Sequence, residues 1–300
     1  KITGSTADLT NTMVSSSSSV IAGTALVTVS DAAFASSSTA IAATTLSNIG
    51  GKTTGAVTLQ NKVRLQGSQS EVATALVGDS SVAASQANTE ARVTTTVNVN
   101  QGEEIAGVNN IQGIFASGVS DSLSSLASGG NSTAKLNTIT GDDGDVAITV
   151  SDSGFTTTSA TLTAADLIAV GGKTTGTVTV TNAVKISGNT ADLTNTLVSG
   201  SSSVTAGTAL VTVSDAAFTT SSATIAATAL SDIGGKTSGA VTVTKAVKIT
   251  GAAADLKNTL VSGSSLVIAS SALVTVSDAA FSTSSATIAA TALSDIGGKT

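Results

Sequence analysis

The sequence predicts a repeat solenoid made of β-strand-rich coils, each of about 31 residues with short strands and a short helix. Three observations predict this α/β solenoid. A 63-residue segment recurs along the chain, aromatic residues make up only 2% of the composition, and strand-like alternation stands beside helix-like spacing. A pure β-solenoid is the alternative that the same observations leave open.

The repeat is visible when two segments are compared directly. Residues 185–237 and 248–300 lie 63 positions apart and are identical at 44 of 53 positions. Because such a period is the signature of a repeat architecture, we expect one continuous solenoid with five parts. These are repeats at 1–63, 122–184 and 185–247, a degenerate repeat at 64–121, and a partial repeat at 248–300.

The degenerate repeat has drifted most between Ala84 and Gly130, and it is about five residues shorter than its neighbours. This stretch also holds Glu90, Arg92, Glu103 and Glu104, so its character differs from that of the other repeats. The role of this stretch stays open.

Composition narrows the class of protein. Hydrophobic residues make up 41% of the chain and charged residues only 11%, while Cys, Pro, His, Trp and Tyr are absent. Small aliphatic side chains fill a thin core well, and their abundance argues against disorder. The net charge of −6 argues against nucleic acid as a partner, and no run of 18 apolar residues could span a membrane. The missing signal peptide before Lys1 suggests a mature or internal piece of a longer protein.

One coil can be read from the segment around residues 223–244. Val241–Thr244 alternates apolar and polar residues, which predicts a strand with Val inward and Thr outward. The apolar spacing in Ala223–Ile233 predicts a short helix. The Gly234-Gly235 pair that follows predicts a left-handed C-cap. The other half of the repeat has Leu256 and Leu260 on one face of a second helix.

A single coil is too thin to be stable by itself, because ordering about 31 residues costs more than its few buried side chains contribute. Stacked coils would cover one another and pair their strand edges. We therefore expect nine to ten coils with like side chains stacked in ladders, and open ends that pair with further repeats or other copies of the chain.

Two sets of carboxylates are candidate metal sites. A column of Asp follows the strand of each clear repeat, and it favours turn formation over a calcium ladder. The loop Gly141–Asp145 carries three carboxylates, which favour either a calcium site or a solvated acidic turn. The Asp column is Asp31, Asp152, Asp215 and Asp278, and the loop acids are Asp142, Asp143 and Asp145.

Three further sets of residues recur with the repeat. Phe34, Phe155, Phe218 and Phe281 predict a buried packing column, with carbohydrate stacking as the alternative. Lysines follow each double glycine at Lys52, Lys173, Lys236 and Lys299, where they can face helix carbonyls. Outward threonines such as Thr242 and Thr244 fit either ordinary strand propensity or an ice-binding surface.

Catalysis needs side chains that exchange protons or attack a substrate. His, Cys and Tyr are absent, and no pair of carboxylates recurs as a cleft would require. We therefore predict that the protein is not an enzyme, that it has no catalytic residue, and that it needs no cofactor other than, in one alternative, calcium.

The phrase VTVSDAAFTTSSATIAATALSDIGGKTSGAVTV and the later KITGAAADLKNTLVSG resemble repeats of very large cyanobacterial and marine bacterial surface proteins. The resemblance implies secretion, a cell-surface or matrix location, and calcium-binding repeats nearby, but it supplies no functional residue. The leading hypothesis is an extracellular filament, sheath or surface-layer protein that assembles with itself. The alternatives are the stalk of a calcium-dependent adhesin, and an ice- or polysaccharide-binding solenoid.

Overall fold

The computed structural model describes residues 1–35, 40–78, 82–156, 161–200, 202, 204–219, 224–263, 265–280 and 287–300. The chain forms two compact units. Unit 1 contains Lys1–Asp121, Thr133–Ile148 and Lys173–Gly176, and unit 2 contains Ser122–Ser132, Thr149–Gly172 and Thr177–Thr300. The boundary at Asp121 coincides with the end of the degenerate repeat.

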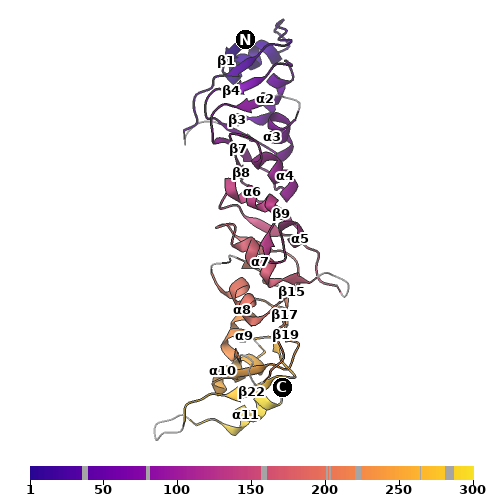
Figure 1. Cartoon of the computed structure of the whole chain (residues 1–300), viewed down its shortest axis with the longest axis vertical. Coiled ribbons are helices and arrows are strands. Elements are labelled where there is room, and N and C mark those ends of the chain that lie inside the picture. Colours follow the sequence, from indigo (N-terminus) through magenta and orange to yellow (C-terminus); the bar gives the residue numbers. More distant parts are fainter. Residues whose placement is uncertain are drawn as a thin grey trace. The chain divides into compact units, whose positions relative to one another are not determined.

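Unit 1 holds two four-stranded parallel sheets, and Figure 1 labels their strands β1, β3, β4, β7 and β8. In the first sheet, Val27 pairs with Ile2 on one side and with Val57 on the other. The first sheet has the order β1 (Ile2–Gly4), β2 (Val27–Val29), β4 (Val57–Leu59), β6 (Val82–Ala84), and the second has β3 (Ile41–Ala42), β5 (Arg64–Gly67), β7 (Thr89–Val93), β8 (Ile111–Phe115). A short strand, β9 (Val119–Asp121), ends the first segment of the unit.

The helices of unit 1 are short and pack one after another, α2 on α3, α3 on α4, and α4 on α6. In Figure 1, α2, α3 and α4 follow one another beside the strands. The helices are α1 (Thr6–Leu9), the π-helix η1 (Thr10–Val14), α2 (Ala43–Gly50), α3 (Gln69–Leu76), α4 (Val99–Ala106) and α6 (Ala134–Asp142).

Unit 2 contains a five-stranded parallel sheet and a three-stranded one. The five-stranded sheet has the order β13 (Leu162–Thr163), β15 (Lys185–Gly188), β17 (Leu210–Val213), β19 (Val241–Val243), β21 (Val267–Ile268), and the smaller sheet has β18 (Ile225–Ala226), β20 (Lys248–Gly251), β22 (Leu273–Val276). Further strands are β12 (Ile148–Val150), β14 (Val178–Val180) and β16 (Val204–Thr205), which are neighbours, and the antiparallel pair β10 (Ala127–Ser128) and β11 (Asn131–Ser132).

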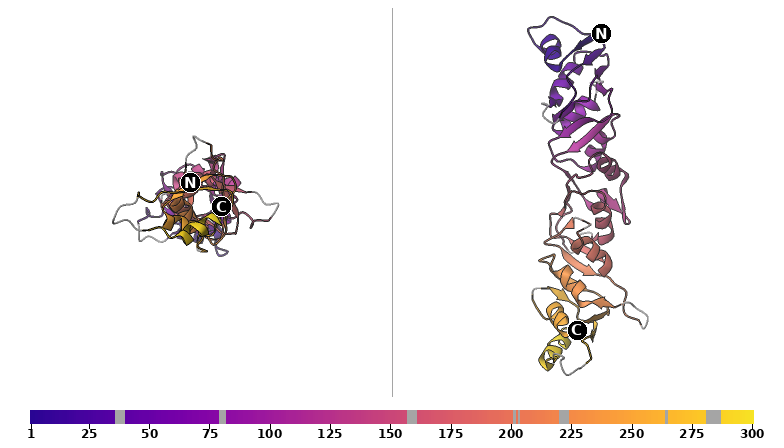
Figure 2. Two further views of the ribbon diagram at one scale, coloured as in Figure 1. Left: turned by 90° about the horizontal axis from the view of Figure 1, so that it is seen from below. Right: turned by 90° about the vertical axis from the view of Figure 1, so that its left-hand side faces the viewer.

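The helices of unit 2 alternate with these strands, and Figure 2 shows this alternation from another side. The last three helices also pack in sequence, with α9 against α10 and α10 against α11. They are α5 (Leu123–Leu126), α7 (Ala164–Gly171), α8 (Thr190–Leu193), the π-helix η2 (Thr194–Val198), α9 (Ala227–Gly234), α10 (Ala253–Leu260) and α11 (Ala290–Gly297). Both units are thus mixed α/β, with short parallel strands in several sheets.

The strand register differs from the expected ladders of identical residues. Ile186 pairs with Val211, 25 residues later, and Val211 pairs with Val241, 30 residues later. Each strand therefore pairs with a strand from a different position of the repeat. Residues that are equivalent in sequence, 63 positions apart, are not hydrogen-bonded neighbours in this sheet.

The strand and the two helices predicted from residues 223–244 and from Leu256 and Leu260 are present, with shifted bounds. Val241 and Val243 are buried on β19 and Thr242 is half-buried between them. Helix α9 begins only at Ala227, because Ile225 and Ala226 form the strand β18 that pairs with β20. The second helix, α10, buries Leu256 and Leu260 as expected.

The predicted left-handed cap at the double glycine is wrong. Gly235 has a φ of −69°, in the right-handed region that any residue can adopt. The first glycine is required for a different reason, because a Cβ at Gly234 would lie 2.0 Å from the backbone oxygen of Ser265. Gly234 therefore permits a close approach between segments, and the pair does not form a left-handed cap.

Candidate functional site

The Asp column caps helices that precede it in the chain. The Thr6 N–H, at the start of α1, donates to Asp31 Oδ2 at 2.7 Å, and the Thr6 hydroxyl donates to Asp31 Oδ1 at 2.9 Å. In unit 2, the Thr190 N–H and hydroxyl both donate to Asp215 Oδ2 at 2.7 Å. These carboxylates satisfy N–H groups that a helix leaves without an internal partner, and their charge suits the helix N-terminus.

Other carboxylates repeat this arrangement. Leu123 N–H donates to Asp152 at 2.6 Å and Ala253 N–H donates to Asp278 at 2.8 Å. The predicted local turn formation is therefore incomplete, because each Asp joins its strand to the helix of the preceding segment. This contact has a separation of 25 residues at three of the four positions, so reading local sequence could not reveal it.

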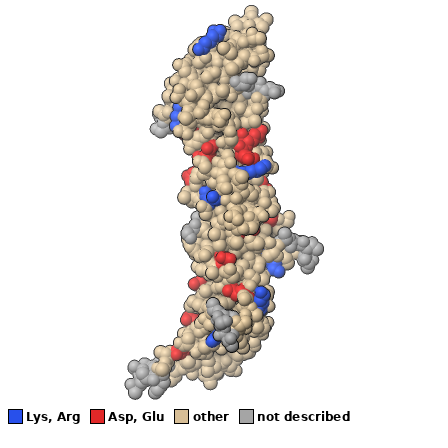
Figure 3. Space-filling model, viewed as in Figure 1, with Lys and Arg blue, Asp and Glu red and all other residues tan. Residues whose placement is uncertain are grey.

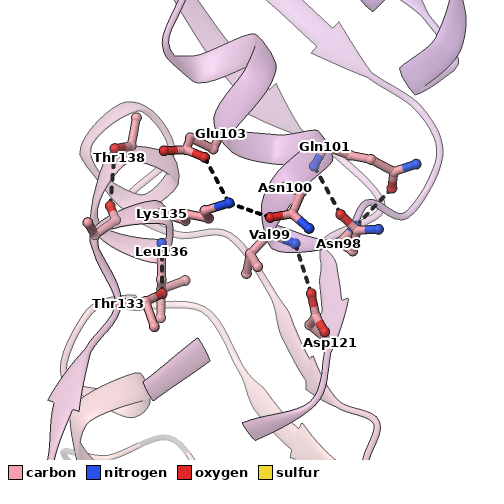
Figure 4. A network of polar contacts seen from close by, with 11 residues as sticks. Asn98, Val99, Asn100, Gln101, Glu103, Asp121, Thr133, Lys135, Leu136 and Thr138 are labelled. Atoms are coloured by element: carbon pink, nitrogen blue, oxygen red, sulfur yellow. Dashed lines mark hydrogen bonds and ion pairs between the residues drawn. The ribbon is translucent and has the colours of Figure 1, made fainter. Parts of the chain in front are cut away.

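The degenerate repeat preserves the same device with other residues (Figure 4). Asp121 accepts the Val99 N–H at 3.1 Å at the start of α4, and Asn98 and Gln101 form a reciprocal capping box. On the neighbouring helix α6, Lys135 Nζ lies 3.5 Å from Glu103 Oε2. Glu103, one of the charged residues of this stretch, therefore links α4 to α6 of the following repeat.

Gly141 and Asp142 end helix α6 and do not lie in the predicted loop, and Asp142 and Asp143 hold the end of β8. Gly113 N–H donates to Asp142 Oδ2 at 2.8 Å, and Phe115 N–H donates to Asp143 Oδ2 at 2.7 Å. Asp143 is only 6% exposed. These bonds give both carboxylates a structural role that the sequence did not suggest.

Burial shifts the pKa of both carboxyl groups upward. It raises the pKa of Asp142, although the bond from Gly113 opposes the shift. Burial also raises the pKa of Asp143, against the bond from Phe115, and the neighbouring Asp145 carboxylate adds to the rise by hydrogen bonding and repulsion. Within the described residues, no group of three His, Cys, Asp or Glu side chains is arranged to hold a metal ion. Calcium binding at Asp142, Asp143 and Asp145 stays a prediction.

The phenylalanines do not form the predicted buried column. Phe34, Phe155 and Phe218 are half-buried, and each lies against a cation from the strand that follows about 30 residues later. The Arg64 guanidinium carbon lies 3.7 Å from the centre of the Phe34 ring. Lys185 Nζ lies 5.7 Å from the centre of the Phe155 ring, and Lys248 Nζ lies 5.6 Å from the centre of the Phe218 ring. Phe281 lies outside the described residues.

A Thr-x-Gly element that sequence reasoning missed joins adjacent segments in both units. The Thr237 hydroxyl donates to the Ala209 carbonyl, 28 residues earlier, and accepts the Gly239 N–H at 3.0 Å. A Cβ at Gly239 would lie 2.2 Å from the same carbonyl oxygen. The equivalent residues are Thr53 with Gly55, and Thr174 with Gly176. The only available signal was the recurrence of KTTG and KTSG after the double glycine.

The lysines that open this element are exposed on the surface. Lys52, Lys173, Lys236 and Lys299 all have exposed side chains. The Lys52 and Lys236 backbone N–H groups donate to carbonyls of the preceding helix at 3.1 Å, so their backbones, more than their ammonium groups, complete the helix ends.

Outward-facing hydroxyls form rows across the parallel sheets. In unit 1, Thr3 pairs with Thr28, and Thr28 with Thr58. A groove of about 450 Å³ runs over this face, lined by Lys1, Leu26, Val27, Thr28, Ala56, Thr58, Gln60 and Ser85. In unit 2, the equivalent row consists of Ser187, Thr212 and Thr242. Neighbouring strands are about 4.8 Å apart, so each row presents hydroxyls at a regular spacing.

Uncharged residues make up most of the surface on the face seen in Figure 3. Among the described residues, every helix is too short or too polar to cross a bilayer. No protein family model, no curated protein and no solved structure matches the chain.

Proposed function

We propose that the chain is a solenoid segment of an extracellular structural protein. Its repeats stack on one another, and the molecule assembles with further copies of itself into a filament, sheath or surface layer. The observation that carries the proposal is the use of both edges of a strand: β17 pairs with the preceding β15 and with the following β19. Stacking of this kind continues for as many repeats as the chain provides.

The side chains that could have carried chemistry support a structural role. Asp31 and Asp215 cap helices of neighbouring segments, and Thr237 bridges two segments through its hydroxyl. These carboxylates and this hydroxyl form hydrogen bonds between one segment and the next. We therefore propose a role without catalysis and without a required cofactor. The extracellular location is proposed from the absence of Cys and from the resemblance of the repeat.

The register suggests a direct test by deletion. Removing residues 185–247 takes out one whole repeat and places Val184 before Lys248, where Val247 normally stands. A solenoid should keep its circular dichroism spectrum and become shorter by about 10–12 Å, because 63 residues cover between two and three strand steps of about 4.8 Å. Small-angle scattering measures the maximum dimension.

A deletion of residues 185–215 serves as the control, since it removes about half a repeat and joins non-equivalent positions. It should lose much of its ordered structure. A near-spherical particle, or two deletions that behave alike, would contradict the proposal. Negative-stain microscopy of the intact chain tests assembly separately, with rods or fibres expected. The adhesin alternative requires calcium to raise the melting temperature relative to EDTA.

A further inference from the structure

The outer face of the five-stranded sheet in unit 2 carries hydroxyls that are free to bind a ligand. Ser187, Thr212 and Thr242 lie side by side in register and are half-buried. Within the part of the chain that the structure describes, none of these three hydroxyls makes a hydrogen bond to another protein group. A row of this kind can pair with a ligand that presents hydroxyls at a similar spacing.

A positive charge stands beside the row. Lys185 and Ser187 alternate with the buried Ile186 on β15, so both side chains face outward. Lys185 Nζ lies 5.7 Å from the centre of the Phe155 ring. Among the described residues, no carboxylate pairs with this ammonium. The ring restricts the lysine side chain, which lowers the entropy lost when an anion binds.

The same combination occurs a second time in unit 2. Lys248 on β20 lies 5.6 Å from the Phe218 ring, and Thr250 pairs with Thr275 on β22. Both threonines are at least partly exposed. A cation supported by an aromatic ring therefore stands beside hydroxyls on two different sheets.

The degenerate repeat offers a natural contrast. There the cation, Arg64, is held by Glu90 at 2.6 Å. The row beside it consists of Gln66, Arg92 and Ile114 in place of hydroxyl residues. The degenerate repeat has thus lost the hydroxyl row, and its Arg64 is already paired with a carboxylate.

We propose that these faces bind an extended polysaccharide that carries carboxylates, such as a polyuronate. Hydroxyls spaced by about 4.8 Å match the sugar hydroxyls of an extended chain, and the unpaired lysines match its carboxylates. The equivalent face in unit 1 is a groove, which suits a polymer chain better than a flat ice lattice.

Affinity electrophoresis of the full chain in polygalacturonate, with neutral dextran as the control polymer, tests this proposal. We expect retardation by polygalacturonate that weakens with added salt, and little retardation by dextran. The double change Thr212→Val and Thr242→Val removes two hydroxyls but keeps the β-branched shape. It should weaken binding on the order of tenfold, since each lost hydrogen bond contributes modestly.

Thr179→Val on β14 is the matched control, because Thr179 is equally half-buried on a sheet whose strands β12, β14 and β16 carry no lysine. It should bind as the parent does. Lys185→Gln combined with Lys248→Gln should reduce binding and its salt dependence. Circular dichroism checks that each variant is folded.

Three results would overturn the proposal: no retardation by polygalacturonate, equal retardation by dextran, or equal loss in the Thr179→Val control. Thermal hysteresis that the double valine change abolishes, without polysaccharide binding, would instead assign the rows to ice. The particle dimensions of the parent chain test the solenoid independently, so either proposal can fail without the other.

Discussion

Replacing Gly234 by alanine tests whether close contact between segments holds unit 2 together. Gly234 ends α9, and an added Cβ would lie 2.0 Å from the backbone oxygen of Ser265 and 3.0 Å from its carbonyl carbon. Both atoms belong to the backbone just before β21, so no side chain can rotate away. The β19–β21 pairing would have to shift to admit the methyl group.

The expected cost follows from this geometry. Overpacking a tight site typically costs 1–3 kcal/mol, and a contact with backbone belongs at the upper end, about 3 kcal/mol. Alanine favours a helix over glycine by at most about 1 kcal/mol, so the net destabilisation should be about 2 kcal/mol. Because proteins open locally in cooperative units, the loss should concentrate in α9, β19 and β21.

Gly297 provides a matched control, since it ends the same sequence, ATALSDIG, in α11. A Cβ there would meet nothing within 4 Å, so Gly297→Ala should be neutral or slightly stabilising. Thermal unfolding followed by circular dichroism, with hydrogen exchange of peptides covering 227–268, measures both variants. Equal shifts in melting temperature for the two variants would refute the reasoning.

Other substitutions test single contacts. Asp215→Ala should destabilise unit 2 by about 1–2 kcal/mol, because two donors of Thr190 lose their acceptor; denaturant titration measures this, and an unchanged midpoint would contradict the capping role. Thr237→Val should cost about 1–3 kcal/mol, since the buried Ala209 carbonyl loses its donor, with faster hydrogen exchange nearby as a second readout. Asp143→Asn should raise the melting temperature at neutral pH. The folded pKa of Asp143 is raised, so the parent loses stability as the pH rises from about 4 through that pKa. The gain over the parent should therefore grow across this range, and a gain independent of pH would exclude titration of Asp143 as its cause.

Local patterns predicted the local structure well. The alternation in Val241–Thr244 predicted correctly which side chains of β19 are buried, because side chains alternate between the two faces of any strand. The spacing of Leu256 and Leu260 identified α10 in the same way. Such periodicity reports which face is buried, and it needs no knowledge of the neighbouring segments.

Contacts between segments were the part that could not be predicted. From the sequence alone, Asp31 is predicted to be a turn residue, but in the structure it accepts a hydrogen bond from Thr6. Gly234 is predicted to be part of a helix cap, but the backbone of Ser265 lies against it. The phenylalanines were expected to be buried because the repeat suggested that like residues stack. The actual register brings Phe155 beside Lys185, a neighbour from a different position of the repeat.

The staggered register has a consequence for how such a chain grows in evolution. Strand β17 pairs with β15 at one edge and with β19 at the other, and these two strands come from different positions of the repeat. Each repeat therefore contains both partners of each kind of strand pairing. A duplication of one whole repeat then supplies a new partner and a new recipient together, without compensating substitutions. Tandem duplication of a whole repeat can therefore lengthen the chain without further substitutions. The 44 identical positions of 53 in its last two copies accord with such duplication.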